Sequence, residues 1–487
     1  MCSLCNNEEH GMPRRDFIKT VGVSVAGVSL GAGGIMGASE VSGPVPVGKA
    51  EKKALIRGAF LFPPTNRLDE EGYYSWPGSD FKAEERQKQY MNRLKEIEGK
   101  LGIRIEMDVK PLDMNSDVDK FIAEIKGTKP DGLLLIPFKK APSGDQTMRI
   151  INETKIPSVV LATLGVFLIG QIKQFSDHKG VFMINSLDNL DAVENGLKMI
   201  KTRVWLQNSL IVNIGGSDTV ESKVPFLGTT VRRIPHQRFY DHFANIKVNS
   251  EVLALADRYR SAAVKVSQPK KEDIIESAKS YFIFKKILAE EQGNAIMMDC
   301  LPGLKVPHKH VPPCMGYMTL RDEGIAMGCE SDLDATLSMM LLQEMFGKPG
   351  FQHNPSYDTE NDCYFCAHCT SASKMNGVDQ PAEPFELMSH AEAGWGTVPR
   401  VHFKAGQEIT IAKYLAKEKP QLLLYSGKTI SCPPIPPTGA CRTNVTATLN
   451  ELENGTDLKG HHLIMVYGNY VKQLKRFSQL FDIEVVV

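Results

Sequence analysis

The chain lacks an excess of charge of either sign. Its 57 Lys and Arg residues balance 57 Asp and Glu residues, so the formal net charge is zero. This balance excludes a general nucleic-acid binder, which would carry a basic excess or stripe. A glycine-rich GxGxxG or P-loop motif is also missing, so no nucleotide ligand is predicted. Apolar residues make up 42% and charged residues 23% of the chain, which excludes disorder, collagen and coiled coil for the whole.

The segment 1–50 has the pattern of an export signal. Arg14 and Arg15 form a twin-arginine motif, and 20–39 is uncharged but too rich in Gly and Ala for a good transmembrane helix. We therefore expect export by the twin-arginine (Tat) pathway, a periplasmic or extracytoplasmic protein, and no stable membrane span in the mature chain. Because this pathway carries folded proteins, it is also a first indication of a metal loaded before export.

Strand and helix patterns alternate through the next 260 residues, roughly two domains by length. Short apolar runs such as 132–137 (GLLLIP) are typical of buried parallel strands, and 82–101 carries an apolar helical stripe. The repeated strand–helix order predicts an α/β fold with two doubly wound, Rossmann-like lobes at 51–175 and 176–310. A strand at 180–184 is expected to open the second lobe.

The pattern of apolar and polar residues changes in the region 311–487. This region contains a helix at 332–346, whose Met and Leu stripe predicts a buried core face. Pro and Gly then punctuate short apolar runs, which predicts a C-terminal domain that is mainly an antiparallel β-barrel. A final helix is expected at about 471–481, before a short apolar strand at 483–487.

The ten cysteines do not form a dense disulfide framework. Cys363, Cys366 and Cys369 have the spacing of half a zinc knuckle, but no second Cys or His pair lies nearby, and the segment also reads as a buried strand. Cys432 and Cys441 flank a Pro-rich loop and could form a bridge in an oxidising periplasm.

Three positions in the last third have the residue types of a metal site. Glu330 stands where an apolar strand ends and a helix begins, His368 ends an apolar strand, and the pair His461 and His462 opens another. Glu and His together suit Mn²⁺, Fe²⁺ or Zn²⁺. Each residue alone also fits an ordinary role: a core histidine, a solvated turn, or a charge at a helix N-terminus.

Several segments form a set that covers roughly 310–487: Pro313-Cys314 with Asp322-Glu323-Gly324 and Cys329 to Leu333, Phe351 to Thr359 continuing to His368-Cys369-Thr370, Gly460-His461-His462 with Tyr467-Gly468, and Phe481 to Glu484. In these segments the chain resembles the L-fucose isomerase/L-arabinose isomerase superfamily. The resemblance implies a three-domain architecture, a small-molecule sugar as substrate, and a homo-oligomer, either a trimer or a hexamer.

The resemblance also implies a divalent cation, usually Mn²⁺ and otherwise Fe²⁺, Mg²⁺ or Zn²⁺. In such enzymes the cation holds two oxygens of an open-chain sugar while a carboxylate moves a proton between C1 and C2. Carried over, Glu330 would be both ligand and acid/base residue, and His368 would lie at the site. One of His461 and His462 would be the C-terminal ligand.

One position departs from the pattern of this superfamily. Asn354 replaces a second ligating Asp, and its amide oxygen can bind a metal but cannot act as a base. Asp358, four residues on, or His353 could replace the missing carboxylate. His310 and Arg442 are candidate contacts to a polyol or an anionic sugar, although a structural role fits each equally well.

The sequence thus predicts a metal-dependent aldose–ketose isomerase for a small polyhydroxy carbonyl substrate. Two alternatives stay open. A non-catalytic sugar- or metal-binding protein on the same fold is favoured modestly by Asn354 and by the export signal. A metal-dependent epimerase or lyase would share the enediolate intermediate.

Overall fold

A computed structural model describes residues 52–71, 78–187, 189–433, 441–452 and 454–487. The segment expected to be an export signal, 1–50, lies outside the described residues. Among the helices of the described part, none is both long and apolar enough to cross a membrane.

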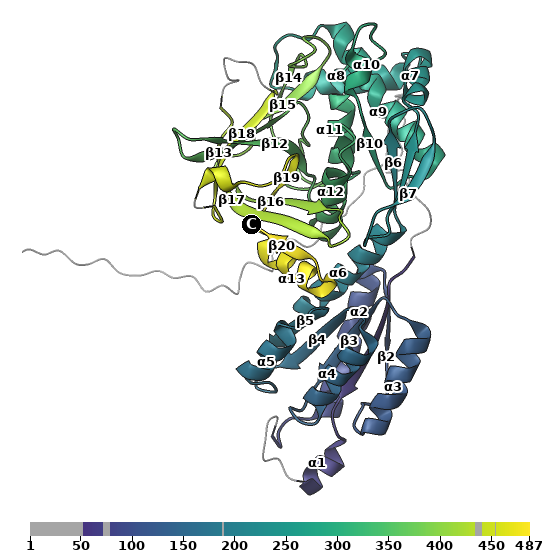
Figure 1. Cartoon of the computed structure of the whole chain (residues 1–487), viewed down its shortest axis with the longest axis vertical. Coiled ribbons are helices and arrows are strands. Elements are labelled where there is room, and N and C mark those ends of the chain that lie inside the picture. The colour runs from purple at the N-terminus through teal and green to yellow at the C-terminus, as the bar shows by residue number, and fades with distance from the viewer. Residues whose placement is uncertain (1–51, 72–77, 188, 434–440, 453) are drawn as a thin grey trace, which may run out of the picture. The chain divides into compact units, whose positions relative to one another are not determined.

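The first part of the chain folds around a five-stranded sheet whose strands are all parallel (Figure 1). In the order β2-β1-β3-β4-β5, the strands are Arg104–Met107, Leu55–Leu61, Gly132–Pro137, Ser158–Thr163 and Val181–Ser186. The run GLLLIP is fully buried, as its apolar composition predicts. The strand expected to open the second lobe is β5. It pairs with β4 of this first sheet instead, because strand pairing is set by non-local register rather than by sequence order.

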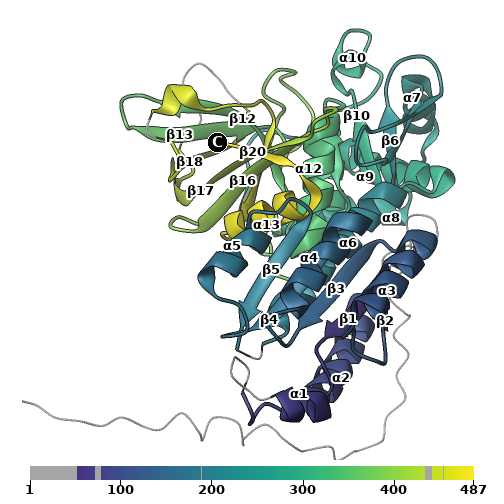
Figure 2. The ribbon, with the colours of Figure 1, turned by 60° about the horizontal axis from the view of Figure 1, so that its bottom comes forward.

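Helices cover both faces of this sheet (Figure 2). Side chains of α2 (Ala83–Leu101) and α6 (Asp191–Asn208) pack in the core on one face. Those of α3 (Asn115–Thr128), α4 (Ser143–Thr154) and α5 (Ile169–Ser176) pack on the other. The short helix α1 (Thr65–Glu71) follows β1. This arrangement confirms the expected α/β class.

A second five-stranded sheet has the order β11-β10-β6-β8-β7. Its strands are Met327–Cys329, Ala295–Met298, Leu210–Ile214, Thr230–Ile234 and Val220–Lys223, and all are parallel except the edge strand β7. One face carries α6 and α12 (Leu333–Phe346). The other carries α7 (His236–Asn245), α9 (Lys271–Glu291) and α11 (Cys314–Asp322). The remaining helices are α8 (Ser250–Ala262) and α10 (Leu301–Leu304).

Two elements of this second sheet region lie beyond residue 310, within the range 311–487 that was predicted to form the C-terminal domain. Strand β11 pairs with β10, and α11 packs in the core of the same sheet. The sequence predicted an apolar strand before Glu330, but not its pairing with β10 of the second sheet. Strand β11 is parallel to β10, so the chain that follows β11 lies at the carboxyl ends of the strands. Ligands of α/β proteins commonly bind there.

The last part of the chain is largely antiparallel, as expected. A seven-stranded sheet has the order β16-β19-β12-β13-β18-β17-β20. Its strands are Glu408–Leu415, Leu463–Tyr467, Phe351–Asp358, Cys363–His368, Thr443–Leu449, Gln421–Ser431 and Glu484–Val486. Strand β16 also pairs with β17, so the first six strands pair in a closed cycle. A three-stranded sheet joins β15 (Val398–Val401), β14 (Phe385–Met388) and β9 (Lys265–Val266), and η1 (Gly455–Asp457) precedes β19.

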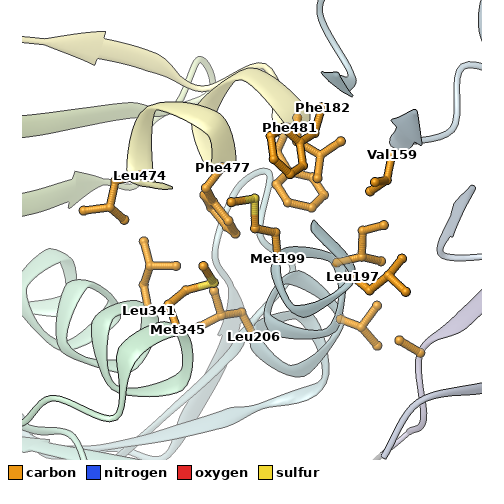
Figure 3. Close-up of a cluster of buried hydrophobic side chains, with 14 of the residues drawn as sticks. Val159, Phe182, Leu197, Met199, Leu206, Leu341, Met345, Leu474, Phe477 and Phe481 are labelled. Carbon is orange, nitrogen blue, oxygen red and sulfur yellow. The ribbon is translucent and has the colours of Figure 1, made fainter. Parts of the chain in front are cut away.

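An apolar core holds α12 in place (Figure 3). Leu341 and Met345 of α12 belong to one buried cluster with Met199 of α6 and Phe477 of α13 (Val471–Phe481). The Met and Leu stripe predicted for this helix is therefore core, as expected. Because α12 begins directly after the β11 turn, this packing also fixes the turn itself.

Candidate metal centre

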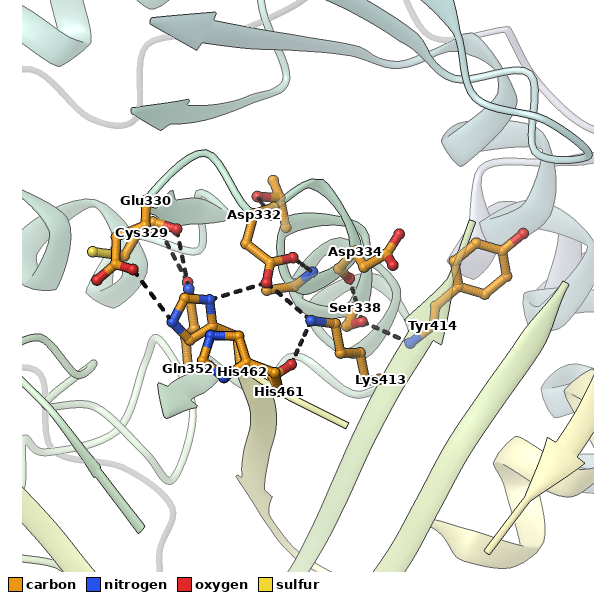
Figure 4. A network of polar contacts seen from close by, with 12 residues as sticks. Cys329, Glu330, Asp332, Asp334, Ser338, Gln352, Lys413, Tyr414, His461 and His462 are labelled. Carbon is orange, nitrogen blue, oxygen red and sulfur yellow. Dashed lines mark hydrogen bonds and ion pairs between the residues drawn. The ribbon is translucent and has the colours of Figure 1, made fainter. Parts of the chain in front are cut away.

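The turn between β11 and α12 carries two consecutive residues in the left-handed region. Glu330 has φ 56° and Ser331 has φ 54°. This conformation costs a non-glycine residue roughly 1–2 kcal/mol, so the surrounding structure must enforce it. Asp332 then caps α12, since its Oδ1 accepts the N–H of Ala335 at 2.8 Å. The turn therefore presents two carboxylates, at positions 330 and 332, from one strand end (Figure 4).

Two histidines from the antiparallel sheet approach the carboxylate of Glu330. His368 ends β13, and its Nε2 lies 3.9 Å from Glu330 Oε1. His462 directly precedes β19, and its Nε2 lies 3.6 Å from Glu330 Oε2. Both imidazoles are almost fully buried, whereas 35% of the Glu330 side chain remains exposed. The structure thus brings together three of the predicted ligands from segments far apart in sequence.

Several polar atoms at this place have no hydrogen-bond partner within the described part of the chain. They are both ring nitrogens of His368 and Nε2 of His462. The buried Oδ1 of Asn354, a residue paired with Ala367 across β12 and β13, also has no partner there. A buried polar atom without a partner costs about 1–3 kcal/mol, so such atoms are rare unless a ligand satisfies them. Neutral imidazole nitrogens and a carboxylate are typical ligands of a divalent transition metal. The residues present fit the cation that the sequence predicts.

Asp332 fixes the tautomer of His462. Its Oδ2 lies 3.0 Å from His462 Nδ1 and 2.9 Å from Lys413 Nζ. Burial alone would raise the pKa of Asp332, but hydrogen bonds from His462, Ala335 and Lys413 lower it to about 2. An ionised carboxylate only accepts hydrogen bonds, so His462 Nδ1 must donate. In the neutral form of the imidazole, Nε2 then carries the lone pair and faces Glu330, as in carboxylate–histidine–metal arrangements.

Burial and neighbouring charges shift the pKa values of His368 and Glu330 in directions that suit a metal centre. Burial lowers the pKa of His368 well below its usual range, which keeps the ring neutral and able to bind a metal. Burial raises the pKa of Glu330; His462 opposes the rise, and the carboxylates of Glu392 and Asp299 add to it. A carboxyl group with a raised pKa exchanges protons more readily near neutral pH. A bound cation would favour its ionised form.

Cys329 is a possible further ligand that the metal prediction omitted. Cys329, Glu330 and His368 each offer one ligand atom within 4.8 Å of the others. The Cys329 backbone is held by Gln352, whose Oε1 accepts its N–H at 2.9 Å and whose Nε2 donates to its carbonyl at 3.1 Å. A hydrogen bond with Cys300, followed by burial, raises the pKa of the Cys329 thiol, so the neutral thiol is a weak ligand. The motif Cys329-Glu330 was the signal that could have indicated it.

Two other predicted residues make contacts of a different kind. Asp358 ends β12 at the hairpin with β13, and its Oδ1 accepts the backbone N–H groups of both Glu360 and Asn361. At the usual strand rise, it lies roughly 13 Å along β12 from Asn354. His461 is exposed and stacks on His462 at a ring distance of 4.0 Å, with its carbonyl accepting a hydrogen bond from Lys413.

The predicted substrate-binding residues have structural partners. His353 is fully buried, contacts the Tyr364 hydroxyl and the Phe351 carbonyl through its two ring nitrogens, and has a pKa lowered to about 3 by burial. His310 is also buried, and its Nδ1 lies 2.7 Å from the Val311 carbonyl.

Arg442 donates from Nε to the carbonyl of Ser389 at 2.8 Å. None of these contacts points to a sugar ligand.

Comparison with known proteins gives an independent indication of function. No family model matches the chain. The chain is 21% identical over 411 residues to the sulfoquinovose isomerases of Priestia aryabhattai and Priestia megaterium, covering 76% of this chain and 88% of each relative. These similarities support an isomerase. A sulfoquinovose isomerase of Alkalicoccus urumqiensis is 24% identical over 216 residues, which cover 42% of this chain and 46% of that relative.

The names of these relatives agree with the sugar isomerase predicted from the sequence. The relatives are sugar isomerases by name, and their similarity extends over most of this chain. The expectation of an enzyme is confirmed, as is the coarse expectation of a sugar isomerase.

Proposed function

We propose that this isomerase depends on a divalent metal and interconverts an aldose and a ketose through an enediolate. The observation that carries the proposal is the set of unpaired, buried imidazole nitrogens of His368 and His462 directed at the carboxylate of Glu330. Glu330, His368, His462 and Asn354 would hold the cation, with Mn²⁺ as the first candidate. When bound, the cation would supply Lewis-acid polarisation of two substrate oxygens and would stabilise enediolate charge.

The chain's own groups perform the positioning and the proton transfer. Asp332 and Lys413 hold His462 in one tautomer and one orientation. Glu330, with its raised pKa, accepts a proton from one substrate carbon and returns it to the neighbouring carbon. The strained turn and the α12 core keep this carboxylate in place between catalytic cycles.

Asp299 is our candidate for the second carboxylate that Asn354 cannot supply. Strands β10 and β11 pair in parallel with Met298 opposite Cys329, so Asp299 and Glu330 leave the sheet side by side. Adjacent strands lie about 4.8 Å apart, which places both carboxylates at one edge of the sheet. The charge of Asp299 is one of the groups that raise the pKa of Glu330. Partial exposure leaves Asp299 open to a substrate.

We therefore expect Asp299→Asn to lower turnover by about 100-fold or more, the usual contribution of a general acid or base. Asp358→Asn is the matched variant: it removes the same charge from the β12–β13 hairpin, and we expect turnover within about twofold of the parent enzyme. Steady-state kinetics on both variants test the assignment. Loss of turnover in Asp358→Asn alone would instead support the assignment drawn from sequence.

The substrate proposed for the first test is sulfoquinovose, because the relatives are named for it. The purified protein is incubated with this sugar, and with unsulfonated aldoses, in heavy water and followed by proton NMR. We expect the C2 proton signal to decay as ketose forms. Removal of metal by a chelator should abolish the exchange, and Mn²⁺ should restore it. Sugar binding without exchange would favour a non-catalytic binding protein, and turnover unaffected by complete metal removal would contradict the metal dependence.

We further propose export by the twin-arginine pathway and assembly into a homo-oligomer. The first is supported by Arg14, Arg15 and the uncharged stretch after them, and the second by the resemblance to a superfamily that forms trimers and hexamers. Fractionation of cells expressing the Arg14→Lys, Arg15→Lys double variant tests the export route.

A further inference from the structure

Two thiols lie together beside the candidate metal centre. Cys369 directly follows His368 at the end of β13, and Cys441 lies two residues before β18, the strand that pairs with β13. The two side chains lie within hydrogen-bonding reach of each other. Cys441 also packs against a small buried cluster that contains Cys314, Cys369 and Met388. Non-local strand pairing therefore joins two thiols that are distant in sequence.

The contact differs from the pairing that the sequence suggested. Cys432, the expected partner of Cys441, lies at the start of the Pro-rich loop, and its sulfur accepts the N–H of Phe403 at 3.0 Å. Cys441 is partly exposed, whereas Cys369 is 5% exposed. His390, also buried, contacts the Cys369 thiol. One thiol of the pair is thus accessible to a reagent, and the other is held behind it.

These contacts fit a disulfide better than a second metal site. Among the described residues, the group of three potential ligand atoms within 4.8 Å of one another is Cys329, Glu330 and His368, and it includes neither Cys369 nor Cys441. Cys314 and His390 also lie beside this pair, but they do not join it in a group whose ligand atoms all lie within 4.8 Å of one another. All eight cysteines that the structure describes are free, so both groups of the pair are thiols.

We propose that Cys369 and Cys441 form a disulfide when the protein meets a disulfide oxidant. The partly exposed Cys441 thiol loses its proton and attacks the oxidant, forming a mixed disulfide and releasing one oxidant thiol. The Cys369 thiolate then attacks the Cys441 sulfur, the mixed disulfide breaks, and the second oxidant thiol leaves. The protein loses two protons and two electrons, and the oxidant disulfide is reduced to two thiols.

The bond would tie the residue after His368 to the segment that leads into β18. It closes a loop of roughly 70 residues, and cross-links of this length stabilise chiefly by constraining the unfolded chain. We therefore expect the oxidised protein to unfold at a higher temperature than the reduced protein.

The test uses the full chain, reduced with dithiothreitol, desalted and incubated with oxidised glutathione. We expect a mass loss of about two hydrogens, a linked peptide containing Cys369 and Cys441 in a non-reducing digest, and a rise in Tm that dithiothreitol reverses. Cys441→Ser should lose all three effects. Cys432→Ser is the matched control, also at a half-buried cysteine, and should keep them.

Three results would overturn the proposal: a linked peptide joining Cys432 to Cys441, a lasting glutathione adduct on Cys441, or no loss of thiols. Because Cys441 is partly exposed, its serine variant is expected to fold, and its Tm under reducing conditions verifies this. The outcome does not depend on the metal or on the substrate, so it is independent of the proposed activity.

Discussion

Glu330→Gln is expected to lower turnover by about 1000-fold or more while the protein stays folded. Glutamine keeps the size of the side chain but removes the negative charge, so it can neither accept a proton nor balance a cation between His368 and His462. The raised pKa of Glu330 shows that its charged form is already disfavoured, so loss of the charge should not reduce stability. Mn²⁺ titration by calorimetry should show weaker binding in parallel.

Glu360→Gln is the matched control, because it makes the same chemical change on an exposed turn. We expect its turnover and Mn²⁺ affinity to equal those of the parent protein. Normal turnover in Glu330→Gln, measured on protein with an unchanged Tm, would remove Glu330 from the mechanism. Unfolding of the variant would be seen in the same Tm measurement.

Asp332→Ala is expected to give the largest loss of stability, about 3–5 kcal/mol, because it leaves Lys413 buried without its carboxylate. The Lys413 side chain is 7% exposed, and the Asp332 side chain is 16% exposed. The substitution also removes the cap of α12. Asp332→Asn separates the two effects, since Asn caps a helix as well as Asp does but carries no charge. Urea unfolding should rank the proteins as parent, Asp332→Asn and Asp332→Ala.

The same carboxylate predicts a pH dependence. Its pKa is lowered to about 2 in the folded protein, below the value of an unfolded Asp. A group of this kind contributes stability that is fully present above the unfolded pKa, near pH 4, and lost as the pH falls through the folded pKa. The contribution is about 2.5 kcal/mol. We expect the free energy of unfolding to drop between about pH 4 and pH 2 in the parent protein, and this part of the drop to be missing in Asp332→Asn. An identical drop in both proteins would contradict the assignment.

Local patterns predicted the elements that carry the site. The apolar run before Glu330, the helix after it and the strand that ends at His368 are all visible as periodicity in the sequence. What periodicity cannot provide is proximity. The geometry directs the imidazole of His462, and not that of the exposed His461, at Glu330, because the backbone turn before β19 decides which side chain faces inward.

The proposed second carboxylate shows the same limit. Asp358 is close to Asn354 in sequence, but an extended strand separates them in space. Asp299 is 31 positions before Glu330 in sequence, yet parallel pairing of β10 and β11 makes them neighbours. Strand register is a long-range property that a single sequence does not display. The contact between Cys441 and the cluster that contains Cys369 likewise depends on the pairing of β13 with β18.

The left-handed backbone at the metal centre has a consequence for selection experiments. Glu330, Ser331 and His462, with φ values of 50–56°, occupy conformations that glycine and asparagine adopt at lower cost. A library randomised at these positions and selected only for survival of heating should therefore enrich glycine and asparagine. The same library selected for growth on the substrate should return the natural residues at 330 and 462. The difference in residue frequencies between the two selected pools would show how much backbone strain is retained at these positions for the sake of catalysis.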